Sequence, residues 1–165
     1  MYFYFPQMLK ADQCDMLNQF AFEKLKNNQM ECESQKECLG RSYGIGGLPP
    51  FEGLLHQLTP IIENATGIKG LEAQNSFVRF YFNGGKMLRH VDRAGLDITL
   101  SLCTYSNIEK PWPLYFEVDG KIASVNTQVG DGVMIAGTKM HHWRDDLICN
   151  EDQFVIQSFY HWRIP

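Results

Sequence analysis

The spacing of hydrophobic positions changes about halfway along the chain, from a helical period to a strand period. Before residue 75, apolar residues recur at three- and four-residue spacing in two segments. This pattern predicts one helix from Asp12 to about Lys26 and a second helix after Pro50, which Pro60 would kink or split. The predicted inward-facing residues are Leu17, Phe20, Ala21 and Leu25 in the first helix and Leu54, Leu58, Ile61 and Ile62 in the second.

From residue 75 onward, the pattern is that of short β-strands. Apolar residues alternate with small polar ones in the segment 97–105, which predicts a strand whose polar face carries Thr99 and Ser101. Asp119-Gly120 is typical of a two-residue hairpin turn. About seven such strands follow the two helices, and Met1–Pro6 is predicted to form a first strand before them. This order favours a small antiparallel barrel or sandwich backed by helices.

Length and charge exclude several classes of protein. The 165 residues suit a single domain spanning 1–165, with a helical support over 1–74 and the barrel over 75–165. The 15 Lys and Arg residues against 19 Asp and Glu give a net charge of −4, which argues against a nucleic-acid-binding protein. No apolar run approaches the ~18 residues of a membrane span, so we expect no membrane partner.

Cysteine content and the beginning of the chain indicate the compartment. The five cysteines are scattered and odd in number, which is typical of free thiols in a reducing environment. The first residues are apolar but lack the basic region and cleavage site of a signal peptide. We therefore expect a cytoplasmic protein.

Two of the chain's five histidine positions lie in a pattern that suits a metal ion. In the extended segment His90-Val91-Asp92, residues two apart point to the same side, so the imidazole and the carboxylate can bind one ion. A histidine about 50 residues further on, His141 or His142, would complete a set of two nitrogens and one oxygen. Such a set leaves three positions of an octahedral iron(II) open. The short pair alone is more often a surface histidine beside a surface aspartate.

Three ordered segments carry a resemblance to a known family. They are Val78–Arg93, Pro111–Val118, and the run Gly130–Gly137 followed by His142-Trp143-Arg144. Together they resemble the 2-oxoglutarate-dependent, non-haem iron(II) oxygenases, and more narrowly their prolyl 4-hydroxylase-like branch, over roughly residues 75–162. The resemblance implies a mainly β, α+β fold: a double-stranded β-helix (jelly-roll) barrel with an N-terminal helical buttress.

The resemblance also implies a metal site and a reaction. Family members place the second histidine directly before Trp-Arg, which selects His142 and implies that His90, Asp92 and His142 bind iron(II). The implied cosubstrates are 2-oxoglutarate and dioxygen, with ascorbate as reductant. The implied reaction hydroxylates a C–H bond, above all in a prolyl or other peptidyl residue, and decarboxylates 2-oxoglutarate to succinate and CO2.

The binding site for 2-oxoglutarate departs from the family pattern. Tyr81 matches a tyrosine that binds a cosubstrate carboxylate in the superfamily, and Thr99 could also reach the cosubstrate. Prolyl-hydroxylase-like enzymes hold the far carboxylate with Lys or Arg about ten residues after the second histidine, where this chain has Glu151-Asp152-Gln153. A buried carboxylate needs a cation. Another residue must therefore supply it.

Three arginines are candidates for this cation. Arg144 comes first, because it lies two residues past His142 and shares its side of an extended strand. Arg163 on the last strand is second, and Arg79, which points with Tyr81 on a regular strand, is third. Each is equally compatible with a structural salt bridge.

Alternatives remain open at the level of the sequence. A non-catalytic, cupin-like barrel could bind a metal or ligand through the same residues, or these residues could lie on the surface of an interaction domain. An oxygenase could act on a peptide, a protein or a small molecule, and the oligomeric state is undetermined. His161, between two aromatic residues, is predicted to pack in the core, or else to support the iron site.

Overall fold

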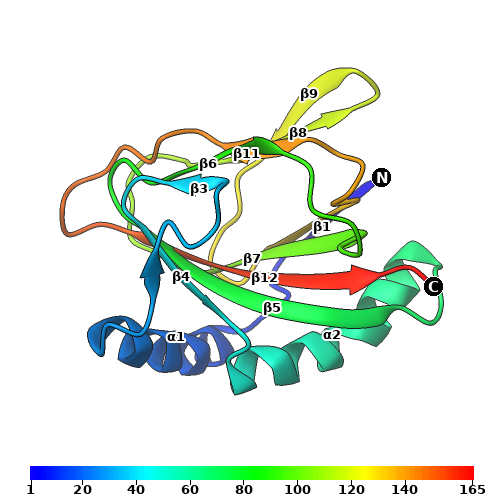
Figure 1. The fold of residues 1–165 in the computed structure, drawn as a ribbon, viewed down its shortest axis with the longest axis horizontal. Helices are drawn as coiled ribbons and strands as arrows, with labels where there is room; N and C mark the ends of the chain where they lie inside the picture. The colour runs from blue at the N-terminus through cyan, green and yellow to red at the C-terminus, as the bar shows by residue number, and fades with distance from the viewer.

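Two antiparallel β-sheets lie face to face in the computed structural model, which describes all residues from 1 to 165, and two helices cover one side of the larger sheet (Figure 1). The elements are, in chain order, β1 (Tyr2–Phe5), α1 (Ala11–Lys26), β2 (Glu31–Cys32), β3 (Cys38–Leu39), β4 (Ser42–Gly46), α2 (Pro49–Thr66), β5 (Glu72–Tyr81), β6 (Lys86–His90), β7 (Ile98–Ser106), β8 (Leu114–Val118), β9 (Lys121–Val125), β10 (Gly132–Ile135), β11 (His142–Arg144) and β12 (Val155–Arg163).

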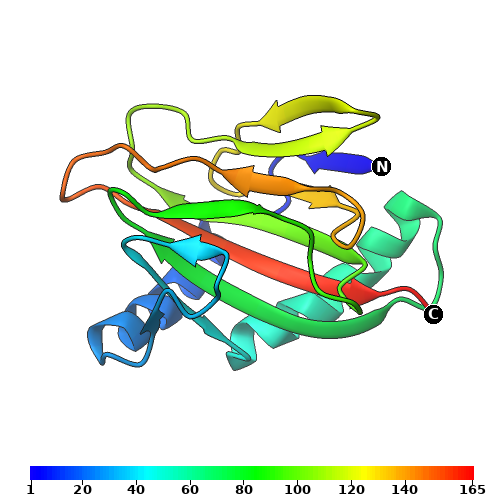
Figure 2. The same ribbon diagram turned by 45° about the horizontal axis from the view of Figure 1, so that its top comes forward.

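The chain alternates between the two sheets from β5 onward. The larger sheet has the order β1-β10-β7-β12-β5-β4-β2, and the smaller one has the order β3-β6-β11-β8-β9. Figure 2 shows β3, β6 and β11 side by side above the long strands β5 and β12. From β5 to β12, strands that follow one another in sequence thus fall in opposite sheets, except for the hairpin of β8 and β9. This arrangement is a double-stranded β-helix, and it confirms the predicted fold class.

The alternating pattern of β7 explains how the larger sheet separates two environments. Ile98, Leu100 and Leu102 belong to the main apolar core, which also contains residues of α1 and α2. Thr99 and Ser101, on the opposite side of the strand, line a cavity between the sheets. The small polar face predicted from the sequence is therefore the inner face of the barrel.

Both predicted helices form, with small differences in their ends and buried faces. α1 begins at Ala11, and the Lys10 N–H before it donates a hydrogen bond to Oε1 of Gln13, so Asp12 lies within the first turn. α2 runs unbroken through Pro60. Neither helix combines the length and the apolar composition needed to cross a bilayer.

The faces that the helices bury are narrower than the sequence pattern suggested. Phe20 and Ile61, which were predicted to face inward, are 37% and 47% exposed. They lie at the edges of the stripes that contact the sheet. The buried residues are Cys14, Leu17, Asn18 and Ala21 in α1 and Phe51, Leu55, Leu58 and Ile62 in α2.

The segment 1–74 contributes strands to both sheets as well as the two helices. β1 pairs with β10 and β4 pairs with β5 in the larger sheet, while β3 pairs with β6 in the smaller one. The buried carboxylate of Asp131 fastens β1, because it accepts hydrogen bonds from the Tyr4 hydroxyl and from the backbone N–H groups of Gln7 and Gln128. The N-terminal part is therefore built into the barrel.

The buried face of β7 supports a prediction about stability. Leu100 has no exposed surface, so Leu100→Ala is expected to lower the free energy of unfolding by about 2–5 kcal/mol through lost burial and a residual cavity. Ile122 on β9 is 66% exposed, and Ile122→Ala is expected to change it by about 0.5 kcal/mol or less. Urea unfolding of the two variants measures both values, and similar losses in both would contradict this description of the core.

Candidate metal centre

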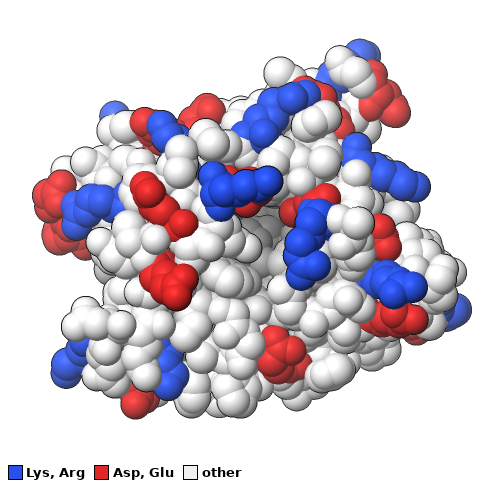
Figure 3. Space-filling model, in the orientation of Figure 1, with Lys and Arg blue, Asp and Glu red and all other residues white.

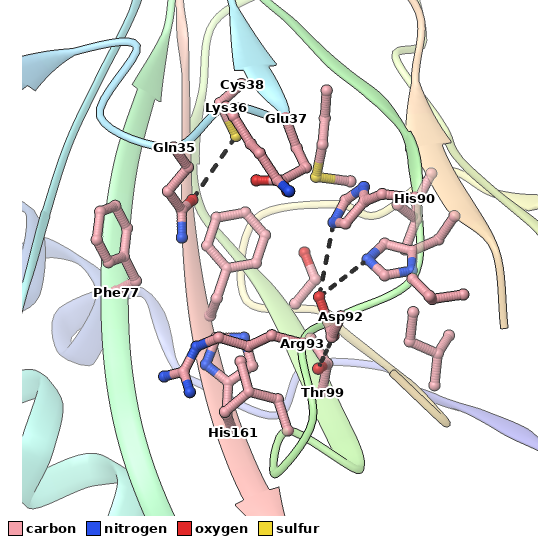
Figure 4. Close-up of a pocket in the computed structure, with 18 residues that line it drawn as sticks. Gln35, Lys36, Glu37, Cys38, Phe77, His90, Asp92, Arg93, Thr99 and His161 are labelled. Carbon is pink, nitrogen blue, oxygen red and sulfur yellow. Dashed lines mark hydrogen bonds and ion pairs between the residues drawn. The ribbon is translucent and has the colours of Figure 1, made fainter. Parts of the chain in front are cut away.

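The register between β6 and β11 brings two histidines together at one end of the smaller sheet. His142 and His90 are paired across these strands, and their imidazole centroids are 4.3 Å apart. Asp92 follows β6 by two residues, and its Oδ1 lies 3.6 Å from Nε2 of each histidine (Figure 4). One donor atom from each residue lies within 4.8 Å of the others. The three side chains that the sequence selected as ligands therefore surround one point.

Backbone carbonyl groups orient both imidazole rings. Nδ1 of His90 lies 2.7 Å from the carbonyl oxygen of Leu88, and Nδ1 of His142 lies 2.9 Å from that of Met140. A carbonyl oxygen only accepts hydrogen bonds, so Nδ1 carries the proton in each ring. The lone pair of each neutral ring is then on Nε2, which faces Asp92 and is free to bind a metal ion.

The carboxylate of Asp92 is held by the opposite sheet. Its Oδ2 accepts a hydrogen bond from the hydroxyl of Thr99, and its backbone N–H donates to the carbonyl oxygen of Gly137 at 2.9 Å. A Cβ atom on Gly137 would lie 2.6 Å from both the Thr99 hydroxyl and the Leu96 carbonyl oxygen and would also collide with Oδ2 of Asp92. Only glycine leaves this space. Thr99, a predicted cosubstrate contact, thus lines the cavity and also orients a predicted ligand.

Electrostatics favour the metal-binding protonation state of Asp92 and His142, but they act in the other direction on His90. Burial tends to raise the pKa of Asp92, but the contacts with His90, His142 and Thr99 outweigh it and lower this pKa to about 2. Burial lowers the pKa of His142 despite the nearby Asp92 carboxylate. For His90, burial acts in the same direction, but hydrogen bonds to Asp92 and to the Leu88 carbonyl raise its pKa above the usual value. Two imidazole nitrogens and one carboxylate oxygen suit iron(II) and similar transition metals.

The three residues line a cavity of about 440 Å3 between the sheets. Figure 3 shows the hollow in the middle of one face of the molecule. Its apolar wall includes Phe77, Leu96, Leu114, Ile135 and Phe159, and the segment from Gln35 to Cys38 and Arg93 also border it. Its volume falls within the ~300–1,000 Å3 typical of small-molecule pockets.

Three further residues lie at or near the site, and the sequence pattern singled out only one of them. His161, for which core packing and support of the iron site were both open, is buried and lines the cavity, and its Nδ1 lies 3.4 Å from the carbonyl oxygen of Asn75. Gln157 accepts a hydrogen bond from the Ser101 hydroxyl at 3.1 Å, and it lies on the inner face of β12. The alternation of β12 could have identified Gln157. No local signal identifies Gly137, since its role depends on a contact with Asp92.

Arg144 is a buried cation without a carboxylate partner. Its Nη1 donates to the carbonyl oxygen of Trp112 at 2.7 Å, and its guanidinium carbon lies 4.8 Å from the centroid of the Trp112 ring system. Its Nε and Nη2 atoms are buried and have no hydrogen-bond partner. Burial lowers the pKa of Arg144 to about 10, so it remains charged near neutral pH. Two donor groups and a full positive charge are thus unmatched inside the barrel.

The other two candidate arginines differ in their burial and in their partners. Arg79 is fully buried and donates to the hydroxyls of Ser42 and Ser34 at 2.8 and 2.7 Å, and more weakly to Gln35. It therefore holds the segment that borders the cavity. Arg163 is 57% exposed and lies 3.8 Å from the carboxylate of Glu72, outside the cavity. The expectation that it binds the cosubstrate does not fit this position, because β12 has passed the level of the metal site at His161.

Tyr81 lies behind the cavity wall rather than on its surface. Its hydroxyl is 3.6 Å from the thiol of Cys38, which lines the cavity, and its ring packs 4.8 Å from that of Trp112. Burial raises the pKa of Tyr81 well above the usual value, so the hydroxyl stays protonated and can donate a hydrogen bond. Tyr81 and Arg144 both contact Trp112, which groups two predicted cosubstrate residues at one place.

Comparison with known proteins places the fold in a recognised group. No protein-family model matches the chain, and no curated protein matches it in sequence. Among solved structures, a prolyl-4-hydroxylase from Pseudomonas putida matches with 14% identity and a TM-score of 0.78, over 99% of this chain and 92% of that one.

Two further structures match over nearly the whole chain. The viral collagen prolyl hydroxylase of Paramecium Bursaria Chlorella virus-1, solved with 2-oxoglutarate, has 14% identity and a TM-score of 0.68 over 99% of this chain and 96% of that one. The non-haem, α-ketoglutarate-dependent carbocyclase SnoK of nogalamycin biosynthesis has 13% identity and a TM-score of 0.75 over 98% and 79%. The chain has the fold of the 2-oxoglutarate- and iron(II)-dependent oxygenases.

The contact between Gly137 and Asp92 gives a prediction about metal binding. Gly137→Ala is expected to displace the Asp92 carboxylate and to weaken the binding of Mn(II) or Fe(II) by tenfold or more. Gly53 lies in α2 with open space around it, so Gly53→Ala is a matched control that should leave metal affinity unchanged. Calorimetric titration of both variants measures the affinities, and an unchanged affinity in Gly137→Ala would show that Asp92 does not bind the metal.

Proposed function

We propose that this protein is a 2-oxoglutarate- and iron(II)-dependent dioxygenase that hydroxylates a C–H bond and converts 2-oxoglutarate to succinate and CO2. The observation that carries the proposal is the arrangement of His90, Asp92 and His142 around one point in a cavity of the oxygenase fold. All three face that point with a lone pair or a negative charge. The donor set leaves one side of an octahedral ion open for other ligands.

The residues present fit an iron(II) ion and its cosubstrate. Nε2 of His90, Nε2 of His142 and Oδ1 of Asp92 would hold the metal, which when bound supplies the electrons that activate dioxygen. The protein orients the ligands through the carbonyl groups behind each histidine and through Thr99 behind Asp92. The apolar wall restricts water near the reacting atoms.

Arg144 is our assignment for the cation that binds the far carboxylate of 2-oxoglutarate. Burying an unpaired charge is costly, and Arg144 has two buried donors without partners. A carboxylate would satisfy both donors and compensate the charge, as a planar guanidinium binds two oxygens at once. Tyr81, which stays protonated beside it, is the assigned second donor. In this arrangement Arg144 replaces the cation that is absent from residues 151–153.

For the substrate we propose a chemical class and not a single compound. A prolyl or other peptidyl residue is our leading substrate, because two of the similar structures are prolyl hydroxylases. A small molecule is the second candidate, and the comparable TM-score of SnoK supports keeping it. Ascorbate is proposed only as a reductant in the assay.

The reaction itself gives the first test of this function. Protein supplied with iron(II), ascorbate and 2-oxoglutarate is expected to release succinate, even without a substrate, and His90→Ala and Asp92→Ala should each abolish this release. His56→Ala is the matched control, because His56 is exposed on α2 and should leave the rate unchanged. Succinate is quantified by mass spectrometry. Absence of succinate and of any 2-oxoglutarate binding in the unmodified protein would refute the proposal.

Arg144 gives a second test, in which stability and ligand binding move in opposite directions. Arg144→Met removes a buried, unpaired charge, so the free energy of unfolding without ligands should stay the same or rise by about 1–3 kcal/mol. The affinity for 2-oxoglutarate should fall by roughly 100-fold through loss of a two-oxygen ion pair. Arg163→Gln, at an exposed position, should change neither value. A 2-oxoglutarate affinity that survives Arg144→Met would move the assignment to Arg79.

A further inference from the structure

Arg93 stands apart from the other arginines because it is exposed at the cavity and has no partner. Two of the six arginines, Arg79 and Arg144, are buried inside the barrel. The other exposed arginines each form an ion pair on the surface: Arg41 with Glu151, Arg89 with Glu117 and Arg163 with Glu72. Arg93 forms no ion pair and no side-chain hydrogen bond, although it borders the cavity and directly follows Asp92 in the sequence.

The side chain of Arg93 is exposed and borders the cavity. The close-up in Figure 4 shows it reaching from the loop after β6 toward β5 and β12, where His161 and Phe77 lie. Basic side chains flank the opening in Figure 3, and the basic residues that border the cavity are Arg93 and Lys36. Lys36 lies 3.8 Å from the carboxylate of Glu37. Of the two basic residues that border the cavity, Arg93 is therefore the one without an ion-pair partner.

The two carboxylates that border the cavity, Asp92 and Glu37, do not pair with Arg93, and Glu37 lies beside Lys36. The carboxylate of Asp92 faces the two histidines and accepts the Thr99 hydrogen bond. Burial lowers the pKa of His161, so this ring is neutral near pH 7. An incoming anion can thus reach Arg93 without displacing a partner, which makes the gain of a new ion pair larger than at a satisfied arginine.

Phe77 offers an apolar surface beside this cation. A Cβ atom on Gly44 would lie 2.5 Å from Cε1 of Phe77, and one on Gly46 would lie 3.0 Å from its Cδ2, so the ring packs closely against the bare backbone of β4. The ring also lines the cavity. Phe159, paired with Phe77 across β12 and β5, continues the same apolar wall. An apolar group can therefore lie on these rings while a charged group contacts Arg93.

We infer that the substrate carries a carboxylate next to an apolar group, with the carboxylate bound by Arg93 and the apolar group resting on Phe77. This inference rests on the proposed oxygenase function and names the chemical class of its substrate. The cavity of about 440 Å3 must also hold 2-oxoglutarate, so it admits only a small molecule or a single side chain with its neighbour. The carboxylate belongs either to a small acid or to an acidic residue of a peptide.

The test is a thermodynamic cycle between the arginine and the charge of the ligand. The full chain is loaded with Mn(II) and 2-oxoglutarate under nitrogen, which prevents turnover, and is titrated calorimetrically with matched acids and amides. The small-molecule probes are N-acetyl-L-proline and N-acetyl-L-leucine with their carboxamides. The peptide probes are acetylated, amidated Gly-Pro-Asp and Gly-Pro-Asn. Arg93→Gln is compared with the unmodified protein and with Arg163→Gln, an exposed arginine outside the cavity.

We expect at least one acid to bind the unmodified protein about tenfold or more tightly than its amide, as one charge-assisted pair provides. This preference should fall below about twofold in Arg93→Gln and persist in Arg163→Gln. The probe pair that shows it identifies the source of the carboxylate, a small acid or a peptide.

Two results would overturn the inference. Acid preference that persists in Arg93→Gln would place the anion elsewhere, and no acid preference with any probe pair would exclude a carboxylate substrate of this size. Succinate release by the iron-loaded, unmodified protein is measured separately. Acid selectivity without succinate release would retain Arg93 as the anion site and reject the oxygenase, whereas succinate release without acid selectivity would do the reverse.

Discussion

The antiparallel register of β6 and β11 is the constraint on which the candidate site depends. It pairs His142 with His90, and a slip by one residue would turn one imidazole to the outside of the barrel, because side chains alternate along a strand. The register also shifts between His142 and Arg144, where the partner of Arg144 is Met87. This bulge lets Met87 and His90, three residues apart, both face the cavity. A regular strand would direct one of them away from it.

The placement of the candidate ligands also determines where the charges of a metal ion and of 2-oxoglutarate would have to be compensated. An iron(II) ion and a 2-oxoglutarate dianion bring equal and opposite charges, so their binding leaves the total charge of the cavity unchanged. What would change is the separation of charge: a bound metal would be held by Asp92, and the far carboxylate would require a cation elsewhere. In the proposed assignment this cation is Arg144, two residues further along the strand that carries His142. The two ends of the cosubstrate would then be matched by residues of one short strand and its neighbour.

Local sequence patterns predicted the parts of the structure that depend on local rules. The two-residue spacing of His90 and Asp92, the polar face of β7 and the hairpin at Asp119-Gly120 all follow from strand periodicity and turn preference. The two-residue strands β2 and β3 left no recognisable pattern, since pairing with β4 and β6 defines them. Their existence depends on tertiary contacts that a periodic pattern does not contain.

The sequence pattern also could not predict the roles of residues that depend on a contact with a distant residue. Nothing near Gly137 indicates that Asp92 requires its missing side chain, and nothing near Thr99 indicates that its hydroxyl binds that carboxylate. Arg163 illustrates the opposite case: a plausible residue type on the right strand lies beyond the end of the cavity, where it meets Glu72. Strand parity predicts which side a residue faces, but the position along the barrel axis requires the register.

Neutral partners around the buried arginines explain how a cation can be fixed in place and still be available to a ligand. Arg144 is held by the Trp112 carbonyl and ring, and Arg79 by two serine hydroxyls and a glutamine, so no carboxylate of the protein compensates either charge. A carboxylate side chain beside Arg144 would make the empty barrel more stable, but it would compete with the anion that the site is proposed to bind. Neutral partners fix the geometry and leave the charge uncompensated. This is the preorganisation by which a folded protein binds an ion more strongly than water does.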